Sequence, residues 1–364
     1  MSKNLNVQTI TKSQLRIALS ENRFWKKQDV TPLSKEKAQW LLDNDRIEED
    51  DFCMVLGFEE EKIIGFIYLM PDLLNTKDKP KKIYWMILWW VANAYKDTVF
   101  GTYLFNSTLQ ATKQKVLVKA YAENVNEFYK KQPFTPILER ERHTIFFALD
   151  KTILQERFSF LKQCGSLINL GNYFISSFIL YQNRNKVKRG TKTIEYEYLS
   201  ELDNETWNFI APLCKNDIIL KNKEYISWQL SSKQYVQTPV FKNNINDGLI
   251  TGSSKNHNGF SFKVMKENKI IGFVSFVLRG GEINIKYLMA EDTNLRTVIN
   301  ALMDNVVQLK ANYLFTDNKN VAEYIKKNYA KVFVYKQNKT GLVHNSIVKE
   351  VDALELTQQD GHFI

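Results

Sequence analysis

The residues best suited to chemistry lie between Ile83 and Phe134, where a turn joins an apolar run to a helical run. The apolar run, Ile83–Ala92, has no charged residue and contains three tryptophans, which is typical of a strand buried on both faces. The turn covers residues 93–101, and the helical run continues to about Gln114. Backbone N–H groups at the start of a helix are free, and the helix dipole favours negative charge there. This turn is therefore a candidate site for an anionic ligand.

Carboxylates near strand ends are the candidates for a general base. Asp72 lies at the end of one predicted strand, and Glu123 lies just past another. A carboxylate beside a substrate amine can accept its proton, although both residues also fit ordinary surface or capping positions. The three cysteines, at 53, 164 and 214, have no metal-binding spacing, so we expect no metal.

The elements that carry these residues follow the order of a parallel α/β unit. A second apolar strand, Val116–Ala120, is followed by a short helix that ends at Tyr129. The N-terminal side adds a strand, two helices capped by Ser13 and Ser34, a hairpin and a polar loop; the C-terminal side adds a closing strand. Their ranges are 6–10, 15–24, 35–44, 52–58 with 62–70, 71–82 and 142–149.

Two short sequence motifs recur in the second half of the chain. Lys62–Phe66 (KIIGF) returns as Lys269–Phe273, and Asn124–Lys131 returns in similar form as Asn320–Lys327. The offsets are 207 and 196 residues, and the order is kept. The same cycle of elements is predicted around both copies, at 195–199, 204–213, 269–278, 282–289, 293–310, 313–316, 320–327 and 331–335. This indicates a duplication, that is, two tandem α/β domains, each a mixed sheet flanked by helices.

At these residues the chain resembles the GCN5-related N-acetyltransferase (GNAT) superfamily. That family has an Arg/Gln-x-x-Gly-x-Gly/Ala loop after a strand, and residues 96–101 (KDTVFG) align with it. Lys96 takes the basic position, Val99 the first glycine and Gly101 the last small residue. The family's later Tyr-x-x-x-Gly-Phe pattern aligns with Tyr129–Phe134, where Pro133 replaces the glycine.

The resemblance implies an N-acyltransferase that uses acetyl-CoA or another acyl-CoA, in which an amine attacks the thioester directly in a ternary complex. Tyr129 would protonate the leaving thiolate, and the general base would be Asp72 or Glu123. The acceptor would be an amino sugar, an amino acid or a peptide. The residues that would contact the cofactor are Trp90, Val91, Ala92, Lys96, Thr98, Val99, Phe100, Gly101, Thr102 and Asn124.

The second copy lacks these features. Its strand is followed by Ala290, Glu291 and Asp292, so two acids stand where phosphates would bind, and Ile325 replaces Tyr129. We therefore expect a catalytic domain at 1–150, a helical bridge with a basic end at 151–192, and a second domain at 193–364 with a degenerate cofactor loop.

The bridge has an amphipathic helix over 167–181, and five basic residues and no acid follow in 184–192. It fits a helix packed between domains or a peripheral contact with an anionic membrane. Two other functions stay open, a Fem-type aminoacyl transferase using charged tRNA and a non-catalytic binding protein, and the oligomeric state is open too. The dispersed cysteines and the absence of a signal-peptide pattern favour a cytoplasmic protein.

Overall fold

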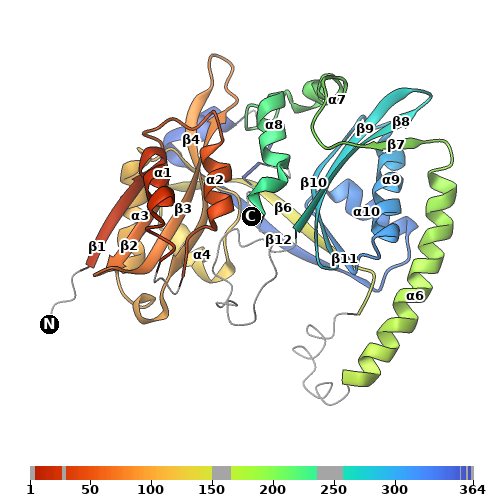
Figure 1. The fold of residues 1–364 in the computed structure, drawn as a ribbon, viewed down its shortest axis with the longest axis horizontal. Coiled ribbons are helices and arrows are strands. Elements are labelled where there is room, and N and C mark those ends of the chain that lie inside the picture. Colours follow the sequence, from red (N-terminus) through yellow and green to blue (C-terminus); the bar gives the residue numbers. More distant parts are fainter. Residues whose placement is uncertain are drawn as a thin grey trace. The chain divides into compact units, whose positions relative to one another are not determined.

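The computed structural model describes residues 5–26, 30–149, 165–235, 257–352, 354–357 and 360–361. The chain forms two compact units (Figure 1). Unit 1 comprises residues 1–139, 214–257 and 340–364, and unit 2 comprises 140–213 and 258–339. Neither unit is a single continuous segment of the sequence.

Unit 1 contains most elements of the first half of the chain and two short helices from the second half. Its strands are β1 (Leu5–Thr11), β2 (Phe52–Glu59), β3 (Lys62–Leu74), β4 (Lys81–Val91) and β5 (Val116–Val118). Its helices are α1 (Lys12–Glu21), α2 (Lys35–Leu42), α3 (Phe100–Ala111), α4 (Asn126–Tyr129), α8 (Lys223–Leu230) and α11 (Val348–Val351).

Unit 2 repeats the cycle with a long helix added at its start. Its strands are β7 (Glu195–Tyr198), β8 (His257–Lys266), β9 (Lys269–Arg279), β10 (Glu282–Ala290) and β11 (Tyr313–Thr316). Its helices are α6 (Gly165–Gly190), α7 (Asn204–Ile210), α9 (Leu295–Gln308) and α10 (Lys319–Asn328). Two further strands, β6 (Phe134–Phe146) and β12 (Phe333–His344), each belong to one unit at their start and to the other at their end.

The strand order is the same in the two units. It is β1-β2-β3-β4-β5-β12 in unit 1 and β7-β8-β9-β10-β11-β6 in unit 2. In both, the fourth strand pairs antiparallel with the third and parallel with the fifth, so both sheets are mixed. The last strand of each sheet comes from the other half of the chain: Leu342 and Val343 of β12 pair with β5, and β6 pairs with β11. The predicted fold class, two mixed sheets flanked by helices, is confirmed.

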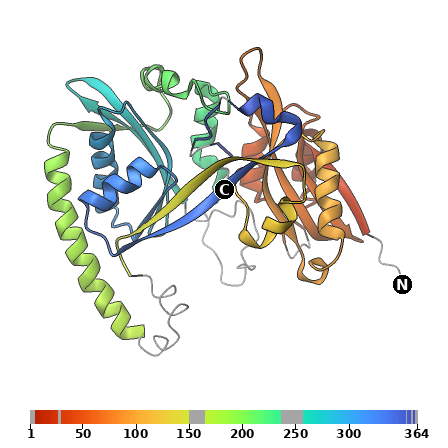
Figure 2. The ribbon, with the colours of Figure 1, turned by 180° about the vertical axis from the view of Figure 1, so that it is seen from behind.

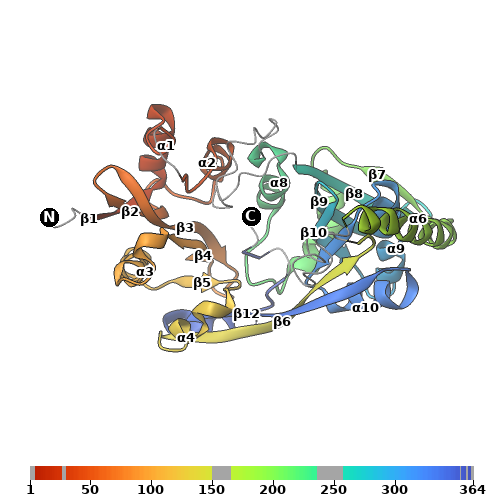
Figure 3. The same cartoon turned by 90° about the horizontal axis from the view of Figure 1, so that it is seen from below.

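Helices cover both faces of the unit 1 sheet. Alternate residues of β2 and β3 point to opposite faces, as the period of a strand requires. Met54, Leu56 and Phe66 pack in one apolar cluster with α1 and α2, whereas Val55 and Ile67 pack in another with α3. Figure 3 shows α1 and α2 on one side of the sheet and α3 on the other. Because both faces are buried, β3 is apolar along almost its whole length.

The glycine of the repeated KIIGF motif has a packing function in both units. An added Cβ at Gly65 would lie 2.7 Å from Leu104 Cδ1 of α3, and one at Gly272 would lie 2.2 Å from Val298 Cγ2 of α9. In each unit the glycine therefore lets the helix after the fourth strand lie close to the sheet.

We expect Gly272→Ala to lower the free energy of unfolding by about 1–3 kcal/mol, because the new methyl overlaps Val298 in a packed core. The matched control is Gly171→Ala in α6, where an added Cβ meets nothing within 4 Å. That variant should be more stable than the wild type by about 0.5–1 kcal/mol, through helix propensity alone. Urea titration of both variants measures the difference, and equal stabilities would contradict this packing role.

Several local predictions are confirmed and others are wrong. Ser34 caps α2 as predicted, but the cap of α1 is Thr11, which forms a capping box with Gln14, and not Ser13. The predicted loop 71–82 is partly strand, because β3 continues to Leu74 and β4 begins at Lys81. The first part of the predicted helical bridge, residues 151–164, lies outside the described residues.

Candidate active site

The edge of β4 opens on the side of β5. β4 pairs with β5 only at Tyr84 and Trp85, and then continues to Val91. Beyond Trp85, no described strand pairs with β4 on this side. Unpaired backbone N–H and C=O groups at a strand edge can bind an extended, amide-containing ligand by adding hydrogen bonds to the sheet.

A bulge directs the backbone groups of this edge. Tyr68 pairs with Leu88 and Leu69 with Met86, so Ile87 is an extra residue in β4. After the bulge, the N–H of Ala92 donates to the Ile64 carbonyl, 2.8 Å away. Because backbone groups alternate along an antiparallel ladder, those of Trp90 also face β3, and those of Trp89 and Val91 face the open side. Of the predicted contacts on this strand, Val91 thus presents free backbone groups, whereas the N–H of Ala92 is already bonded.

Helix α3 begins just past this edge and offers free donors. The Thr98 hydroxyl donates to the Tyr95 carbonyl (2.7 Å) and accepts from the Phe100 N–H (3.2 Å). The N–H groups of Gly101 and Thr102 are the next two, and they have no intrahelical acceptor. An added Cβ at Gly101 would lie 3.4 Å from the Trp89 ring and 3.5 Å from the Val91 side chain. The start of α3 and the open edge of β4 are therefore adjacent.

The loop residues divide into anchors and exposed groups. Phe100 is buried, and its ring fills the space above Gly57 and Gly65, so only its backbone is available. Lys96, Thr98 and Val99 are exposed. Val99 has φ −70° and ψ −5°, a conformation open to any residue, so the valine at the family's first glycine position causes no backbone strain.

Tyr129 ends α4 and is almost fully buried. Its ring contacts Phe105, Phe128, Phe134 and Tyr121, with centroids 4.9–6.1 Å apart. Its hydroxyl has no hydrogen-bond partner among the described residues. Burial, with a smaller contribution from Tyr121, raises the pKa of Tyr129 well above its usual value, so the hydroxyl keeps its proton at neutral pH. It can serve as a proton donor.

Aromatic contacts link Tyr129 to the open edge of β4. Phe105 of α3 lies 5.5 Å from Trp89 and 6.1 Å from Tyr129 between ring centroids, and Phe128 also contacts both rings. Trp89 was not among the residues predicted to contact the cofactor, yet its Nε1 is buried and has no hydrogen-bond partner in the described structure. An unpaired buried donor is a common sign of a ligand position. The sequence signal was only its place in a tryptophan-rich strand.

The two predicted carboxylates lie in different surroundings. Glu123 is exposed in the single turn that precedes α4, next to the exposed Asn124. Asp72 is buried in β3 and pairs with Ile83 of β4. Ile83 comes three residues before Met86, the first residue of the open edge. Asp72 therefore lies about 10 Å along the strand from that edge. Of the two carboxylates, Glu123 lies in the turn that leads directly into α4, the helix that carries Tyr129.

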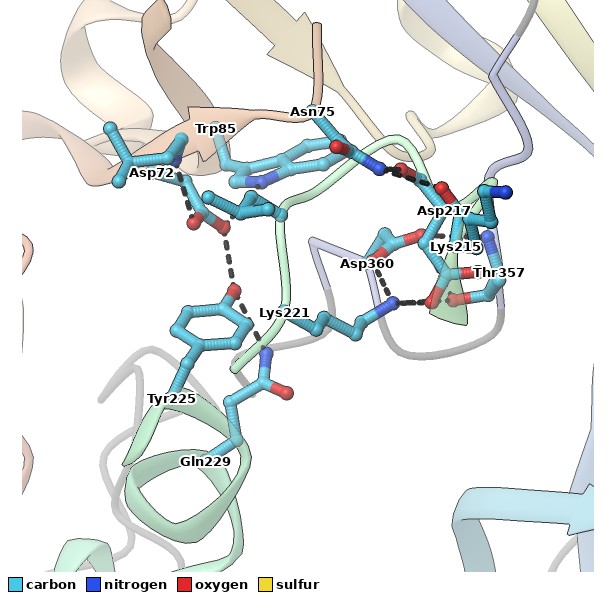
Figure 4. A network of polar contacts seen from close by, with 12 residues as sticks. Asp72, Asn75, Trp85, Lys215, Asp217, Lys221, Tyr225, Gln229, Thr357 and Asp360 are labelled. Atoms are coloured by element: carbon cyan, nitrogen blue, oxygen red, sulfur yellow. Dashed lines mark hydrogen bonds and ion pairs between the residues drawn. The ribbon is translucent and has the colours of Figure 1, made fainter. Parts of the chain in front are cut away.

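Asp72 accepts several hydrogen bonds in a buried network of unit 1 (Figure 4). Its Oδ2 accepts from Tyr225 Oη (2.6 Å) and Trp85 Nε1 (3.2 Å), and its Oδ1 accepts from the Leu73 N–H (2.9 Å). Arg46 lies 3.6 Å from Oδ1. The carboxylate therefore ties α8 to β3 and β4. This places a segment from the second half of the chain in the core of unit 1.

A second part of this network holds the C-terminal segment. Lys221 Nζ is buried, lies 2.8 Å from Asp360 Oδ1 and also pairs with Asp217 (Figure 4). Burial opposes the charge of Lys221, but the two carboxylates keep its pKa above the usual value. Gly361 follows with φ +65°, and an added Cβ there would lie 2.7 Å from the Trp85 ring. Glycine is required here both for the backbone conformation and for this close approach.

The Asp72 network predicts a pH dependence of stability. Burial raises the pKa of Asp72 to about 6, although Tyr225 and Arg46 act in the opposite direction. An unfolded Asp has a pKa near 3.9, so between these values the folded chain binds a proton that the unfolded chain does not. The free energy of unfolding contributed by Asp72 should therefore rise as the pH falls through 6. Relative to Asp72→Asn, the wild type should gain about 2 kcal/mol between pH 7 and pH 4.5 in urea titrations. Parallel pH profiles for the two proteins would contradict the assignment.

Unit 2 has the same opening with different chemistry. β10 pairs with β11 only through Asn284 and then continues to Ala290. It also carries a bulge, at Lys286, four residues before its end, as Ile87 is in β4. However, the exposed acids Glu291 and Asp292 precede α9. Ile325, at the place of Tyr129, is fully buried in the core.

Comparisons of the backbone decide the fold. No protein-family model matches the chain, and no curated protein matches its sequence. Solved structures do match. N-myristoyltransferase from Saccharomyces cerevisiae with bound myristoyl-CoA has a TM-score of 0.52 and 12% identity over 95% of this chain and 83% of that one. A glucosamine N-acetyltransferase region of a fungal β-N-acetylglucosaminidase, described as GCN5-related, has a TM-score of 0.50 and 11% identity over 94% and 38%.

The chain has the fold of the GCN5-related N-acetyltransferases. A probable N-acyltransferase from Enterococcus faecalis V583 is also similar, with a TM-score of 0.50 and 8% identity over 95% of this chain and 75% of that one. The predicted GNAT resemblance is thus confirmed at the level of the fold. At these identities the roles of single residues stay predictions.

The residues that the structure describes contain neither a metal-binding cluster nor a membrane-spanning helix. No group of three or more His, Cys, Asp or Glu residues in them could hold a metal ion. None of the described helices is long and apolar enough to cross a membrane.

Proposed function

We propose that this chain is an acyl-CoA-dependent N-acyltransferase in which unit 1 binds the CoA thioester. The observation that carries the proposal is the meeting of three features in unit 1: the open edge of β4, the free N–H groups at the start of α3, and the unpartnered hydroxyl of Tyr129. The fold neighbours include a myristoyl-CoA complex and a glucosamine N-acetyltransferase, which supports an acyl-CoA donor and an amine acceptor such as an amino sugar, an amino acid or a peptide.

Each feature suits one part of acyl-CoA, which supplies an activated thioester. The N–H groups of Gly101 and Thr102, with the exposed Lys96 nearby, would bind the pyrophosphate. The backbone of Trp89 and Val91 would pair with the amides of the pantetheine arm, as an added strand does. Thr98, Val99 and Asn124 would contribute exposed contacts beside these groups.

The reaction needs a base, a polarised carbonyl and an acid. The acceptor amine attacks the acyl carbon, and backbone N–H groups of β4 stabilise the developing oxyanion. Tyr129 donates its proton as the carbon–sulfur bond breaks, so that the thiol leaves neutral. Glu123, exposed ahead of α4, and Asp72 are the two carboxylates we propose for taking the amine proton.

Unit 2 serves another purpose in this proposal. Glu291 and Asp292 would repel a pyrophosphate at the start of α9, and Ile325 cannot donate a proton. The conserved order of strands with altered loop chemistry supports acceptor binding rather than cofactor binding by this unit.

Hydrogen exchange with and without acetyl-CoA tests the location of the cofactor. We expect the amides of residues 89–103 to exchange at least about tenfold more slowly in the presence of saturating acetyl-CoA. Residues 285–297 of unit 2 serve as the internal control and should not change. Protection of 285–297 instead, or no protection in either segment, would contradict the proposal.

A further inference from the structure

The long helix α6 of unit 2 has an exposed apolar face. Among the described residues, seven of fifteen exposed large hydrophobic side chains belong to this one helix. Phe174, Phe178 and Tyr181 are 63%, 61% and 68% exposed, and Leu167 and Leu170 continue the row toward the N-terminus. Spacings of three and four residues place these five on one side of the helix. We call them the α6 stripe.

The stripe cannot turn inward, because the opposite side of α6 is fixed to unit 2. Ile168, Ile179 and Val187 are buried on that side, where α6 packs along α9. Asn183 donates to the Ala330 carbonyl and accepts from the Ala330 N–H, both at 2.8 Å. Figure 2 shows α6, in yellow-green, lying along the blue helices of unit 2. The rotation of α6 is thus set by specific contacts, and the stripe stays in solvent.

Charge distinguishes what could cover the stripe. The 26 residues of α6 contain Arg184, Lys186, Lys188 and Arg189 and no acid, and Lys192 follows. Lys310, exposed at the end of α9, lines a cavity with Tyr173 and Ser177 on the flank of the stripe. A second copy of this chain that packed through its own α6 would bring the same cations and no acid. An anionic lipid surface supplies both negative charge and an apolar layer.

We propose that the α6 stripe docks unit 2 on an anionic membrane surface, with the helix lying in the plane of the interface. A helix of 26 residues is about 39 Å long, so the stripe and the basic end contact the surface together. Phe and Leu enter the boundary between headgroups and acyl chains, the tyrosines lie at the headgroup level, and Arg184, Lys188 and Arg189 pair with lipid phosphates. This inference is independent of the proposed transferase activity.

Co-sedimentation with vesicles of known composition tests the proposal. The full-length protein should bind phosphatidylcholine vesicles containing 30% phosphatidylglycerol, and it should bind pure phosphatidylcholine at least about tenfold more weakly. Phe174→Glu with Phe178→Glu should reduce binding to the anionic vesicles at least about tenfold, because two side chains leave the apolar layer. Both positions are exposed, so thermal melting should show an intact fold.

Two further variants separate the contributions. Ile17→Glu changes another exposed apolar residue, on α1 of unit 1, and should leave vesicle binding unchanged. Arg184→Gln, Lys188→Gln and Arg189→Gln together should weaken binding about 100-fold. Unchanged binding of the phenylalanine variant would overturn the proposal, as would equal binding to both vesicle types. A dimer in light scattering that dissociates in this variant, with no vesicle binding, would also overturn it.

Discussion

Tyr129→Phe is expected to lower kcat about 100-fold and to leave the KM for acetyl-CoA within about twofold. The substitution removes one hydroxyl that has no partner among the described residues, and it keeps a ring that Phe105, Phe128 and Phe134 hold in place. The leaving thiolate then departs without a proton from the protein. Once an amine acceptor has been identified, steady-state kinetics with a thiol-release assay measures kcat and the KM for acetyl-CoA.

The control for this variant is stability. Because the ring and its contacts remain, the free energy of unfolding should change by less than about 0.5 kcal/mol. Tyr121→Phe is the matched variant, since Tyr121 contacts Tyr129 but its own hydroxyl donates to Asn126. It should keep most of the activity. Equal losses of kcat and of acetyl-CoA affinity in Tyr129→Phe would show that the residue is structural.

Gly101→Val is expected to weaken acetyl-CoA binding at least about 100-fold without unfolding the chain. A Cβ at this position fits between Trp89 and Val91 in ordinary contact, but the two extra methyl groups of valine do not. They would move the start of α3 away from the edge of β4 and separate the two sets of donors that we propose for one ligand. The cost in stability should be about 1–3 kcal/mol.

Gly101→Ala provides the comparison for this second variant. Its single methyl lies 3.4 Å from the Trp89 ring, so the helix need not move and most of the affinity should remain. Fluorescence of Trp89 and its neighbours, titrated with acetyl-CoA, gives the three affinities. Wild-type affinity in a folded Gly101→Val protein would exclude this loop as the cofactor site.

Much of the fold could be predicted because its signals are local. Each of these signals lies within a few neighbouring residues. The run Ile83–Ala92 forms β4, and the turn after it leads into α3. The two KIIGF motifs form the two helix–sheet contacts. The duplication could be predicted because two sequence motifs recur in the same order in both halves of the chain. Periodicity and short motifs report such features directly.

The pairing of strands that lie far apart in the sequence could not be predicted in the same way. No residue pattern in β12 indicates that Leu342 and Val343 pair with β5, more than 200 positions earlier in the chain. Asp72 was predicted at the end of a strand, where the polar loop 71–82 begins, yet β3 continues to Leu74 and Pro71 pairs with Tyr84 inside the sheet. Its burial depends on Tyr225, which the second half of the chain supplies. The bulge at Ile87, which turns the Trp89 backbone toward the open side, also has no local sequence sign.

Calorimetric titration of the purified protein with acetyl-CoA tests the central claim most directly. The account predicts saturable binding at one site per chain. In unit 1 the single acid before the helix start, Asp97, follows Lys96, whereas two acids and no base, Glu291 and Asp292, precede the helix start of unit 2. Binding at two sites per chain would contradict the assignment of unit 2, and no binding at all would contradict the acyl-CoA proposal itself.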